Sequence, residues 1–429
     1  MDRNRRALLG AGLLLPATGL AVAARAADGA IPALPATTLP PEQLAGDEAY
    51  WSAVAGQYDI TGEVNHLENG YWGAMGRQVL AAYQRHSAEV NRGNAWYGRV
   101  QYPPQYLAAR ATAAAMLGVG EDEIAFTRGA TEALQALIGG YNRLRPGDAV
   151  LHADIDYDSM IAAMRWLGPR RQVQVHRIAL PDVPTHQQIL DAYQAAFERV
   201  PRLKLVLLTQ VSHRHGLVIP VAQIAQMARA RGIDAIVDAA HGFGQLDYRV
   251  PDLQADFVGI NLHKWIGAPV GVGALYIRNG RVQDIDPYMG NDDSGKADSR
   301  VHTGTSNFAA YLAVPEAIDL HQRIGAARKQ ARLRLLRNRW TDAARRMPHL
   351  EVLASPDPRL TSAIASFRLR GRATPEDNRT LQKTLLERYR IFTTARDALD
   401  SGSCVRVTPA VFTSVRQIDA LVEALSQLG

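Results

Sequence analysis

Short apolar runs alternate with amphipathic stretches through the middle of the chain. Runs of strand length occur at 124–127, 149–152, 172–176, 203–209, 233–237, 257–260 and 273–277. Between several of them, apolar residues recur at the three- and four-residue spacing of a helix, over 131–144, 159–167, 186–199 and 221–231. Strands that alternate with helices predict an α/β fold with a mainly parallel seven-stranded sheet, covered by helices on both faces. In such folds the ligand lies beyond the carboxyl ends of the strands.

The pattern changes after about residue 310. One long helical region is expected at 315–345, followed by strands at 363–369 and 404–408 and helices near 375–389 and 414–428. We therefore predict a large domain over 71–310 and a smaller α+β domain over 311–429. An extension at 27–70 is expected to join the small domain, and its Ala- and Pro-rich part up to residue 60 is expected to be a loose lead-in.

The first 26 residues have the pattern of a targeting segment. Arg5 and Arg6 precede an apolar stretch at 7–23, and 24–26 reads Ala-Arg-Ala, a cleavage pattern. Three glycines and Pro16 interrupt the stretch, which makes it a poor permanent anchor. The paired arginines predict a twin-arginine signal peptide over 1–26, the export machinery as a partner, and a periplasmic mature protein. A general secretory signal and an N-terminal anchor are the alternatives.

Composition narrows the class further. The formal net charge of +6 is partly carried by the leader, and the rest is too small to indicate binding to nucleic acid or a membrane surface. Cys404 is the one cysteine, so the chain has no internal disulfide and depends on its core. No metal site is predicted.

Lysine is rare in this chain, which sharpens the search for an amine catalyst. Lys+Arg total 48, and the lysines are Lys204, Lys264, Lys296, Lys329 and Lys383. Lys264 alone lies in an apolar, aromatic segment, 261–267, directly after a predicted strand, whereas Lys329 and Lys383 lie among charged helical residues. Desolvation there would keep the amine near neutral, as imine chemistry requires. The alternative is a lysine that extends from a strand end into solvent.

Two further features lie at predicted strand ends. Asp238 ends an apolar strand, where a carboxylate needs a cationic partner such as a pyridinium nitrogen. Adjacent parallel strands would bring Asp238 and Lys264 to one edge of the sheet. The turn 127–132, Thr-Arg-Gly-Ala-Thr-Glu, opens a helix whose free N–H groups can bind an anion. Alternatively, Asp238 is a turn or capping residue and 127–132 an ordinary capping turn.

These features in this order resemble the class V aminotransferase family of fold-type I enzymes that use pyridoxal 5′-phosphate (PLP), in particular its epimerase-like branch. The family includes cysteine desulfurases and isopenicillin N epimerase-like proteins. The resemblance implies that Lys264 holds PLP as a Schiff base and shuttles the proton, and that Asp238 pairs with the pyridine nitrogen. It further implies cofactor contacts by Ala130, Thr131, Tyr157, His213, His241, Asn261 and His263.

The resemblance also implies a substrate side and a second subunit. Arg406 matches the arginine that binds a substrate carboxylate, and Asn69 and Tyr71 are expected to line the substrate side. Gly304 and Thr305 resemble a loop that one subunit of a homodimer lends to the phosphate of the other. The alternatives are an exposed strand arginine for Arg406 and a core-packed tyrosine for Tyr157.

The reaction stays open at this stage, because one lysine serves transamination, epimerisation and elimination alike. Cys404 lies two residues before Arg406 and not on the preceding loop, 393–403, where a desulfurase carries its thiolate, so we expect it to be structural. Together with the leader, the chain resembles periplasmic PLP enzymes that remodel the glutamate side chain of pyoverdine-type siderophores. We predict an aminotransferase acting on such a precursor. The alternatives are an amino-acid or peptide epimerase, a lyase, or a protein that binds cofactor without turnover.

Overall fold

The computed structural model describes residues 33–302 and 304–428, and the predicted signal peptide lies outside these ranges. A seven-stranded sheet runs in the order β2-β8-β7-β6-β5-β3-β4. Its strands are β2 (Ile124–Thr127), β3 (Ala149–Ala153), β4 (Gln174–Ile178), β5 (Leu203–Thr209), β6 (Asp234–Asp238), β7 (Phe257–Asn261) and β8 (Gly273–Ile277). All neighbours pair in parallel except β8, which is antiparallel to both β2 and β7. The predicted α/β fold is confirmed.

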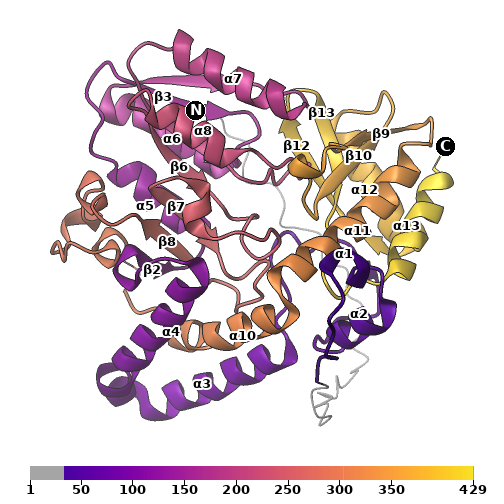
Figure 1. Ribbon diagram of the computed structural model, residues 1–429, viewed down its shortest axis with the longest axis horizontal. Helices are drawn as coiled ribbons and strands as arrows, with labels where there is room; N and C mark the ends of the chain where they lie inside the picture. The colour runs from indigo at the N-terminus through magenta and orange to yellow at the C-terminus, as the bar shows by residue number, and fades with distance from the viewer. Residues whose placement is uncertain (1–32, 303, 429) are drawn as a thin grey trace, which may run out of the picture. The chain divides into compact units, whose positions relative to one another are not determined.

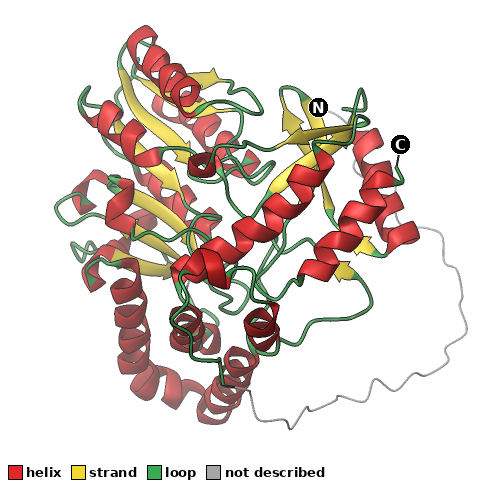
Figure 2. Cartoon of the chain, turned by 45° about the vertical axis from the view of Figure 1, so that its right-hand side comes forward, coloured by secondary structure: helices red, strands yellow, loops and turns green. Residues whose placement is uncertain are grey.

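Helices cover both faces of this sheet, because consecutive strand residues point to opposite sides (Figure 2). Leu205 and Leu207 of β5 belong to the core on the side of α5 (Ala130–Gly140) and α6 (Asp158–Arg171). Val206 and Leu208 belong to the core of the other side. That side carries α3 (Arg77–Trp96), α4 (Tyr102–Leu117), α7 (His186–Arg199), α8 (Val221–Arg229), α9 (Phe308–Leu312) and α10 (Val314–Ile324). A π-helix, Tyr97–Gln101, joins α3 to α4.

A second, antiparallel sheet follows in the order β12-β13-β10-β9 (Figure 1). Its strands are β9 (Leu350–Leu353), β10 (Ala365–Leu369), β12 (Thr394–Leu399) and β13 (Gly402–Val407). The core beside it includes side chains from α11 (Ala326–Ala344), α12 (Pro375–Tyr389) and α13 (Val415–Ser426). The smaller α+β unit is thus present, while the boundaries placed at residues 70 and 310 stay predictions.

Two expectations for this half of the chain were wrong. The long helix at 315–345 is two helices, α10 and α11, because Gly325 between them has a φ of 92°, which a helix cannot continue through. The segment 393–403, expected as a loop, forms most of the β12–β13 hairpin. β12 reads Thr-Ala-Arg-Asp-Ala-Leu, so its sequence lacks the apolar run by which strands were recognised.

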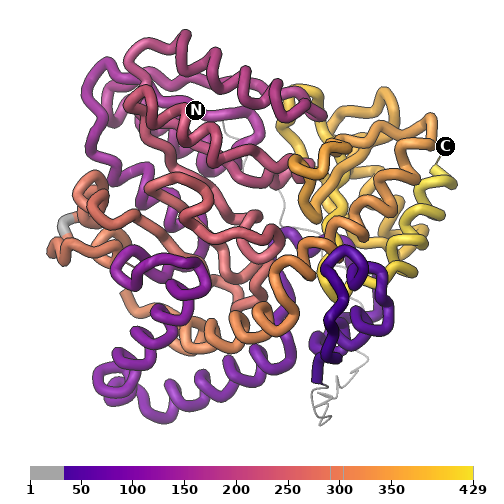
Figure 3. Tube along the Cα trace, viewed as in Figure 1, coloured from indigo at the N-terminus to yellow at the C-terminus, as the bar shows by residue number. Residues whose placement is uncertain are grey.

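The described part of the lead-in, 33–60, contains helices and is partly buried, against expectation. It forms α1 (Pro41–Leu44) and α2 (Glu48–Ala55), and Asp47 caps α2 by accepting hydrogen bonds from the N–H groups of Ala49 and Tyr50. Trp51 is 1% exposed. In Figure 3 this indigo segment lies beside the orange and yellow part of the chain, and Arg332 of α11 donates to the Ala45 carbonyl. Farther on, β1 (Asn65–His66) pairs in parallel with β11 (Ile391–Phe392).

Short 3₁₀ turns complete the secondary structure. They are Glu121–Glu123, Val250–Leu253, Val282–Asp284, Tyr288–Gly290, Ala297–Arg300 and Pro358–Leu360. Within the described ranges, no helix combines the length and the apolar character that crossing a bilayer requires.

Candidate active site

A cavity of about 1380 Å³ opens at the carboxyl ends of β5, β6 and β7. β6 and β7 are parallel neighbours, with Val237 paired to Val258 and Asp238 to Gly259. Asp238 therefore ends one strand while Lys264 follows the end of the next, and both line the cavity. The expectation that two adjacent strands bring them to one edge is confirmed.

Lys264 is partly buried in the cavity wall, and its Nζ lies 2.8 Å from Nε2 of His241. Desolvation lowers the pKa of Lys264 to about 7, with the guanidinium charges of Arg406 and Arg396 acting in the same direction. The carboxyl groups of Asp238 and Glu68 oppose this shift. An amine with a pKa near neutrality is in large part unprotonated at physiological pH, as a nucleophile or base must be.

Asp238 and His241 are each about one-twentieth exposed. Asp238 accepts a hydrogen bond from the Ala240 N–H at 2.9 Å. Burial raises the pKa of Asp238, and this N–H and the charge of Lys264 oppose the shift. Burial also holds the pKa of His241 well below its usual range, and the His241 Nδ1 has no hydrogen-bond partner among the described residues. A buried carboxyl group and a buried imidazole nitrogen thus face the cavity with capacity for a polar ligand.

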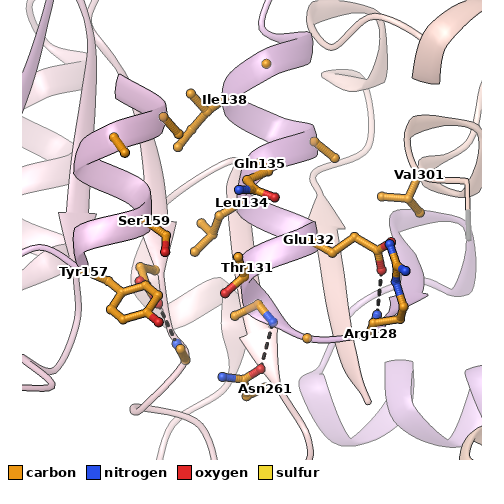
Figure 4. A pocket seen from close by; sticks show the side chains of 18 of the residues that line it. Arg128, Thr131, Glu132, Leu134, Gln135, Ile138, Tyr157, Ser159, Asn261 and Val301 are labelled. Carbon is orange, nitrogen blue, oxygen red and sulfur yellow. Dashed lines mark hydrogen bonds and ion pairs between the residues drawn. The ribbon is translucent and has the colours of Figure 1, made fainter. Parts of the chain in front are cut away.

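The turn before α5 is shaped for close approach. Gly129 has a φ of 154°, and a Cβ on it would lie 3.1 Å from Oδ1 of Asn261. That same oxygen accepts the Ala130 N–H at 2.7 Å (Figure 4). The Ala130 N–H, which was expected to bind an anion, is therefore already donated to Asn261, and this hydrogen bond fixes the turn. The next first-turn N–H groups belong to Thr131 and Glu132, which both line the cavity.

His263 also lines the cavity, but its ring is already engaged. Its Nδ1 donates to the Val272 carbonyl at 2.8 Å, because a carbonyl oxygen can only accept. Burial lowers the pKa of His263 to about 4, so the ring is neutral and Nε2 is an acceptor. Contact with a phosphate therefore requires His263 to gain a proton, which the phosphate charge would favour.

Tyr157 and His213 form one wall of the cavity. Tyr157 is the residue before α6, 38% exposed, and its ring meets that of His213 edge-on at 5.1 Å between centroids. The alternative of a core-packed tyrosine is wrong. His213 is buried, its Nδ1 has no partner in the described chain, and burial together with nearby cations lowers its pKa well below the usual range.

Arg406 on β13 is fully buried, so the alternative of an exposed strand arginine is wrong. Its Nη1 donates to the His213 carbonyl at 2.7 Å, and its Nη2 forms an ion pair with Oε1 of Glu68 at 2.5 Å. Gly70 leaves room for the guanidinium, since a Cβ there would lie 2.6 Å from Nη2. Burial lowers the pKa of Arg406 to about 10, and Glu68 counteracts the shift.

Tyr71 lines the cavity, whereas Asn69 does not. Asn69 is buried outside the cavity lining, and its amide donates to the carbonyls of His66 and Thr408. It therefore ties the N-terminal segment to the end of β13, which corrects the expectation of a substrate-facing side chain. Tyr71 lines the cavity, is 70% exposed, and packs against Trp72 with ring centroids 4.7 Å apart.

Gly304 and Thr305 are exposed and do not line the cavity of their own chain, although the neighbouring His302 does. His302 stacks on Tyr288 with ring centroids 6.5 Å apart. A role for Gly304 and Thr305 in the site of a second subunit stays a prediction.

The sequence reasoning missed one residue of the cavity and one buried lysine outside it. Arg396 lines the cavity but lies in the segment expected to be a loop. Lys329, expected among exposed charged residues, is 3% exposed, and its Nζ donates to the Trp265 carbonyl at 2.6 Å and lies 3.1 Å from Nδ1 of His321. The arginine-rich sequence of α11 made its buried face hard to recognise, since Arg332 and Arg337 are themselves buried.

The residues present fit PLP. A buried carboxyl group at Asp238 suits a pyridinium nitrogen, the open nitrogens of His241 and His213 suit ring substituents, and the Thr131 turn suits a phosphate. When bound, PLP supplies an electron sink that makes the Cα–H of an amine substrate acidic.

An α/β fold whose sheet is covered by helices on both faces, with this lysine, aspartate and anion turn, defines a fold-type I PLP-dependent enzyme. The sequence model of the family described as Aminotransferase class-V matches residues 76–416, and the chain belongs to that family. It is 27% identical over 402 residues to isopenicillin N epimerase of Streptomyces clavuligerus, covering 89% of this chain and 98% of the epimerase. It is also 27% identical over 303 residues to a probable cysteine desulfurase of Xylella fastidiosa strain Temecula1, covering 67% and 71% of the two chains.

Solved structures share the fold. The apo cysteine desulfurase of Thermococcus onnurineus NA1 superposes with a TM-score of 0.76 at 20% identity, covering 87% of this chain and 97% of that one. A variant of C-DES with glycine covalently linked to its PLP cofactor gives 0.75 at 21% identity, covering 87% and 99%.

Cys404 separates this chain from the desulfurases among its relatives. It is the one cysteine in the sequence, is fully buried, and does not line the cavity. Burial raises the pKa of its thiol to about 11, so the thiolate is scarce at neutral pH. The expectation of a structural cysteine agrees with this placement.

Proposed function

We propose that this protein is an aminotransferase that acts on the amino group of an amino-acid or peptide substrate. The observation that carries the proposal is Lys264, a cavity amine whose pKa is about 7 and whose Nζ is 2.8 Å from His241. The buried, scarcely ionised Cys404 argues against sulfur transfer.

The chain's own residues supply the steps of such a reaction. With PLP bound, Lys264 would be the residue that holds the cofactor, and its free Nζ would be the base that accepts the Cα proton of the substrate amine. A transaminase would require the resulting Lys264 ammonium to keep that proton within the site and donate it away from Cα, whereas return to Cα would regenerate the amine substrate. His241, neutral and within hydrogen-bonding distance, holds the Nζ in place between these steps. Tyr157 and His213 shield the reacting group on one side of the cavity.

The finer part of the proposal is a periplasmic substrate, the amino group of a glutamate side chain on a pyoverdine-type siderophore precursor. The cavity volume of about 1380 Å³ supports a substrate larger than a free amino acid beside the cofactor, because ligand pockets usually measure roughly 300–1,000 Å³. The paired arginines of the leader support export. Fractionation of cells that express the full chain checks this part, because replacing Arg5 and Arg6 by lysine should leave the protein in the cytoplasm.

A homodimer with shared sites is part of the same proposal. Exposed Gly304 and Thr305, outside their own cavity, support it. Mixing inactive Lys264→Ala and Thr305→Ala chains should restore activity if one subunit completes the site of another. A monomer in sedimentation at working concentration would contradict it.

Epimerisation is the second candidate, favoured by the isopenicillin N epimerase relative that this chain matches over 98% of the epimerase's length. PLP-saturated enzyme incubated in D₂O with single amino acids and with siderophore precursors separates the reactions. A transaminase forms a keto acid without ammonia and needs an amino acceptor for turnover. An epimerase forms no keto acid but inverts and deuterates Cα, and a lyase releases ammonia. Inversion without keto acid would overturn the aminotransferase proposal.

A further inference from the structure

Two arginines face the cavity from neighbouring strands of the smaller sheet. In the β12–β13 pair, Arg396 lies opposite Cys404 and Thr394 lies opposite Arg406. Paired residues share a face, and Cys404 and Arg406 share one because they are two residues apart. Arg396 and Arg406 therefore project from the same face of the hairpin, and both line the cavity.

Arg406 already has a carboxylate partner. Glu68 binds its Nη2, and the side chain of Glu68 is only 7% exposed. The pair is buried and monodentate, since Oε2 of Glu68 and Nε of Arg406 have no partners among the described residues. Nη1 of Arg406 donates to the His213 carbonyl, so both terminal nitrogens of this guanidinium are engaged and only Nε is without a partner in the described chain. A substrate carboxylate that binds Nη2 of Arg406 must displace Glu68, which would leave the buried Glu68 carboxylate without its cationic partner.

Arg396 is in the opposite situation. Among the described residues it has no ion pair, and its buried Nε has no hydrogen-bond partner. The adjacent Asp397 cannot neutralise it, because Asp397 faces the other side of the strand and is held by Ser403 and Arg379. The charge of Arg396 lowers the pKa values of Lys264, His241 and His213, which places it near the reacting end of the cavity.

We propose that Arg396, and not Arg406, binds the carboxylate of the substrate, and that Glu68 holds Arg406 as a fixed part of the wall. The substrate is then an amine that carries a carboxylate within reach of Arg396. A guanidinium with free donors suits this role, because it grips a carboxylate with two parallel hydrogen bonds. This assignment deepens the proposed function by naming the substrate class, and it concerns binding, which does not depend on which reaction follows.

The test is a binding measurement on the PLP-loaded enzyme with glutarate, a dicarboxylate that has no amine to react, and with glutaramide, its uncharged counterpart. Calorimetry should show glutarate binding more tightly than glutaramide to the wild type. Arg396→Met should weaken glutarate binding about 10–100-fold and abolish the preference, as expected for loss of a charge-assisted hydrogen-bond pair. Arg379→Met, an exposed arginine bound to Asp397 on the outer side, is the matched control and should bind glutarate like the wild type.

Glu68→Gln decides between the two arginines. If Glu68 is a fixed partner of Arg406, glutarate affinity should change by less than about threefold, because the substrate site lies at Arg396. A tenfold or greater gain in glutarate affinity in Glu68→Gln would mean that Arg406 is the carboxylate site, and this would overturn the proposal. So would unchanged glutarate binding in Arg396→Met, or no preference for glutarate in the wild type.

Further controls distinguish a loss of glutarate binding from a loss of folding, and the carboxylate site from the type of reaction. Arg396→Lys, which keeps the charge but loses the fork, should fall between wild type and Arg396→Met, and circular dichroism checks that each variant is folded. If no keto acid forms from any amine but the Arg396 dependence of glutarate binding holds, the aminotransferase proposal fails and the carboxylate site stands. If keto acid forms but glutarate binding does not depend on Arg396, the aminotransferase proposal stands and the carboxylate site at Arg396 fails.

Discussion

Lys264 and Lys329 lie in two different regions, the carboxyl edge of the seven-stranded sheet and the helix α11 that packs behind Trp265. Desolvation lowers the pKa of both amines to about 7. Lys264 lines the cavity and lies near Asp238, His241 and two arginines. Lys329 is outside the cavity lining and is enclosed between the Trp265 carbonyl and His321. A shifted pKa therefore shows desolvation in both places, and contact with the cavity is what distinguishes a reactive amine from a structural one.

The largest expected difference between the two lysines is in activity. Lys264→Ala should lower kcat by about 10²–10⁴-fold or more, because a positioned base is lost. Lys329→Met should keep kcat within about tenfold, since its role is to support the backbone at Trp265. Borohydride reduction of the PLP-loaded enzyme followed by peptide mass spectrometry should find the cofactor on the Lys264 peptide. Cofactor on the Lys329 peptide would reverse the comparison.

Substitution of a residue near Lys264 should lower activity more than substitution of a residue near Lys329. Asp238→Asn removes a charged partner of the cofactor ring and should lower kcat/KM by about 10–100-fold. His321→Asn touches only the buried Lys329 contact and should leave kcat/KM nearly unchanged while lowering the thermal midpoint. Steady-state kinetics and thermal unfolding of both variants check this, and equal kinetic losses would show that the two regions are catalytically coupled.

The pH dependence of stability should reveal Lys329. Between pH 7 and about 10, an unfolded lysine stays protonated while the folded Lys329 has lost its proton. The unfolded state then binds more protons, so the free energy of unfolding rises with pH, by about 1.4 kcal/mol per pH unit. Lys329→Met should remove this slope, and the exposed Lys383→Met should not. Reversible denaturant unfolding of PLP-loaded protein at pH 7.5 and 9 measures it, and identical slopes in wild type and Lys329→Met would refute the assignment.

The smallest effect is expected at Cys404, a third titratable group outside the cavity lining. Its thiol is fully buried and has a pKa of about 11. Cys404→Ala should keep kcat within about twofold, and iodoacetamide should leave the native thiol unmodified. Rapid alkylation that also abolishes activity would show that Cys404 is a reactive group of the site, like Lys264, and not a structural group, like Lys329.

The elements that sequence predicted well are those with local signals. The apolar strands of the large sheet and the residues at their ends, Asp238 and Lys264, follow from runs of four to seven residues and from the geometry of parallel strands. The turn at Thr131 was placed for the same reason. Its hydrogen bond from Ala130 to Asn261 was not, because which N–H an amide side chain takes depends on a contact across 131 residues.

The remaining misses have non-local causes. The burial of Lys329 and Arg332 on α11 depends on contacts with Trp265, Ala45 and Thr413, which periodicity along one helix does not contain. The ion pair of Glu68 with Arg406 joins residues 338 positions apart. Arg396 was overlooked because a polar edge strand looks like a loop when each residue is considered alone. The lead-in was predicted to be loose from its composition, but Trp51 is buried in a hydrophobic cluster with residues far along the chain.

β1 pairs with β11, which lies more than 300 residues later in the chain, so this part of the fold can form only late in synthesis. The wall that holds Arg406 needs Glu68 from the start of the described chain and the strand that ends at Val407. A ribosome adds about 5–20 residues per second, so the N-terminal segment waits roughly 20–80 s for its partner to emerge. Until then no complete site exists to capture PLP or an amine. A chain that ends before β13 would therefore lack Arg406, and with it one wall of the cavity.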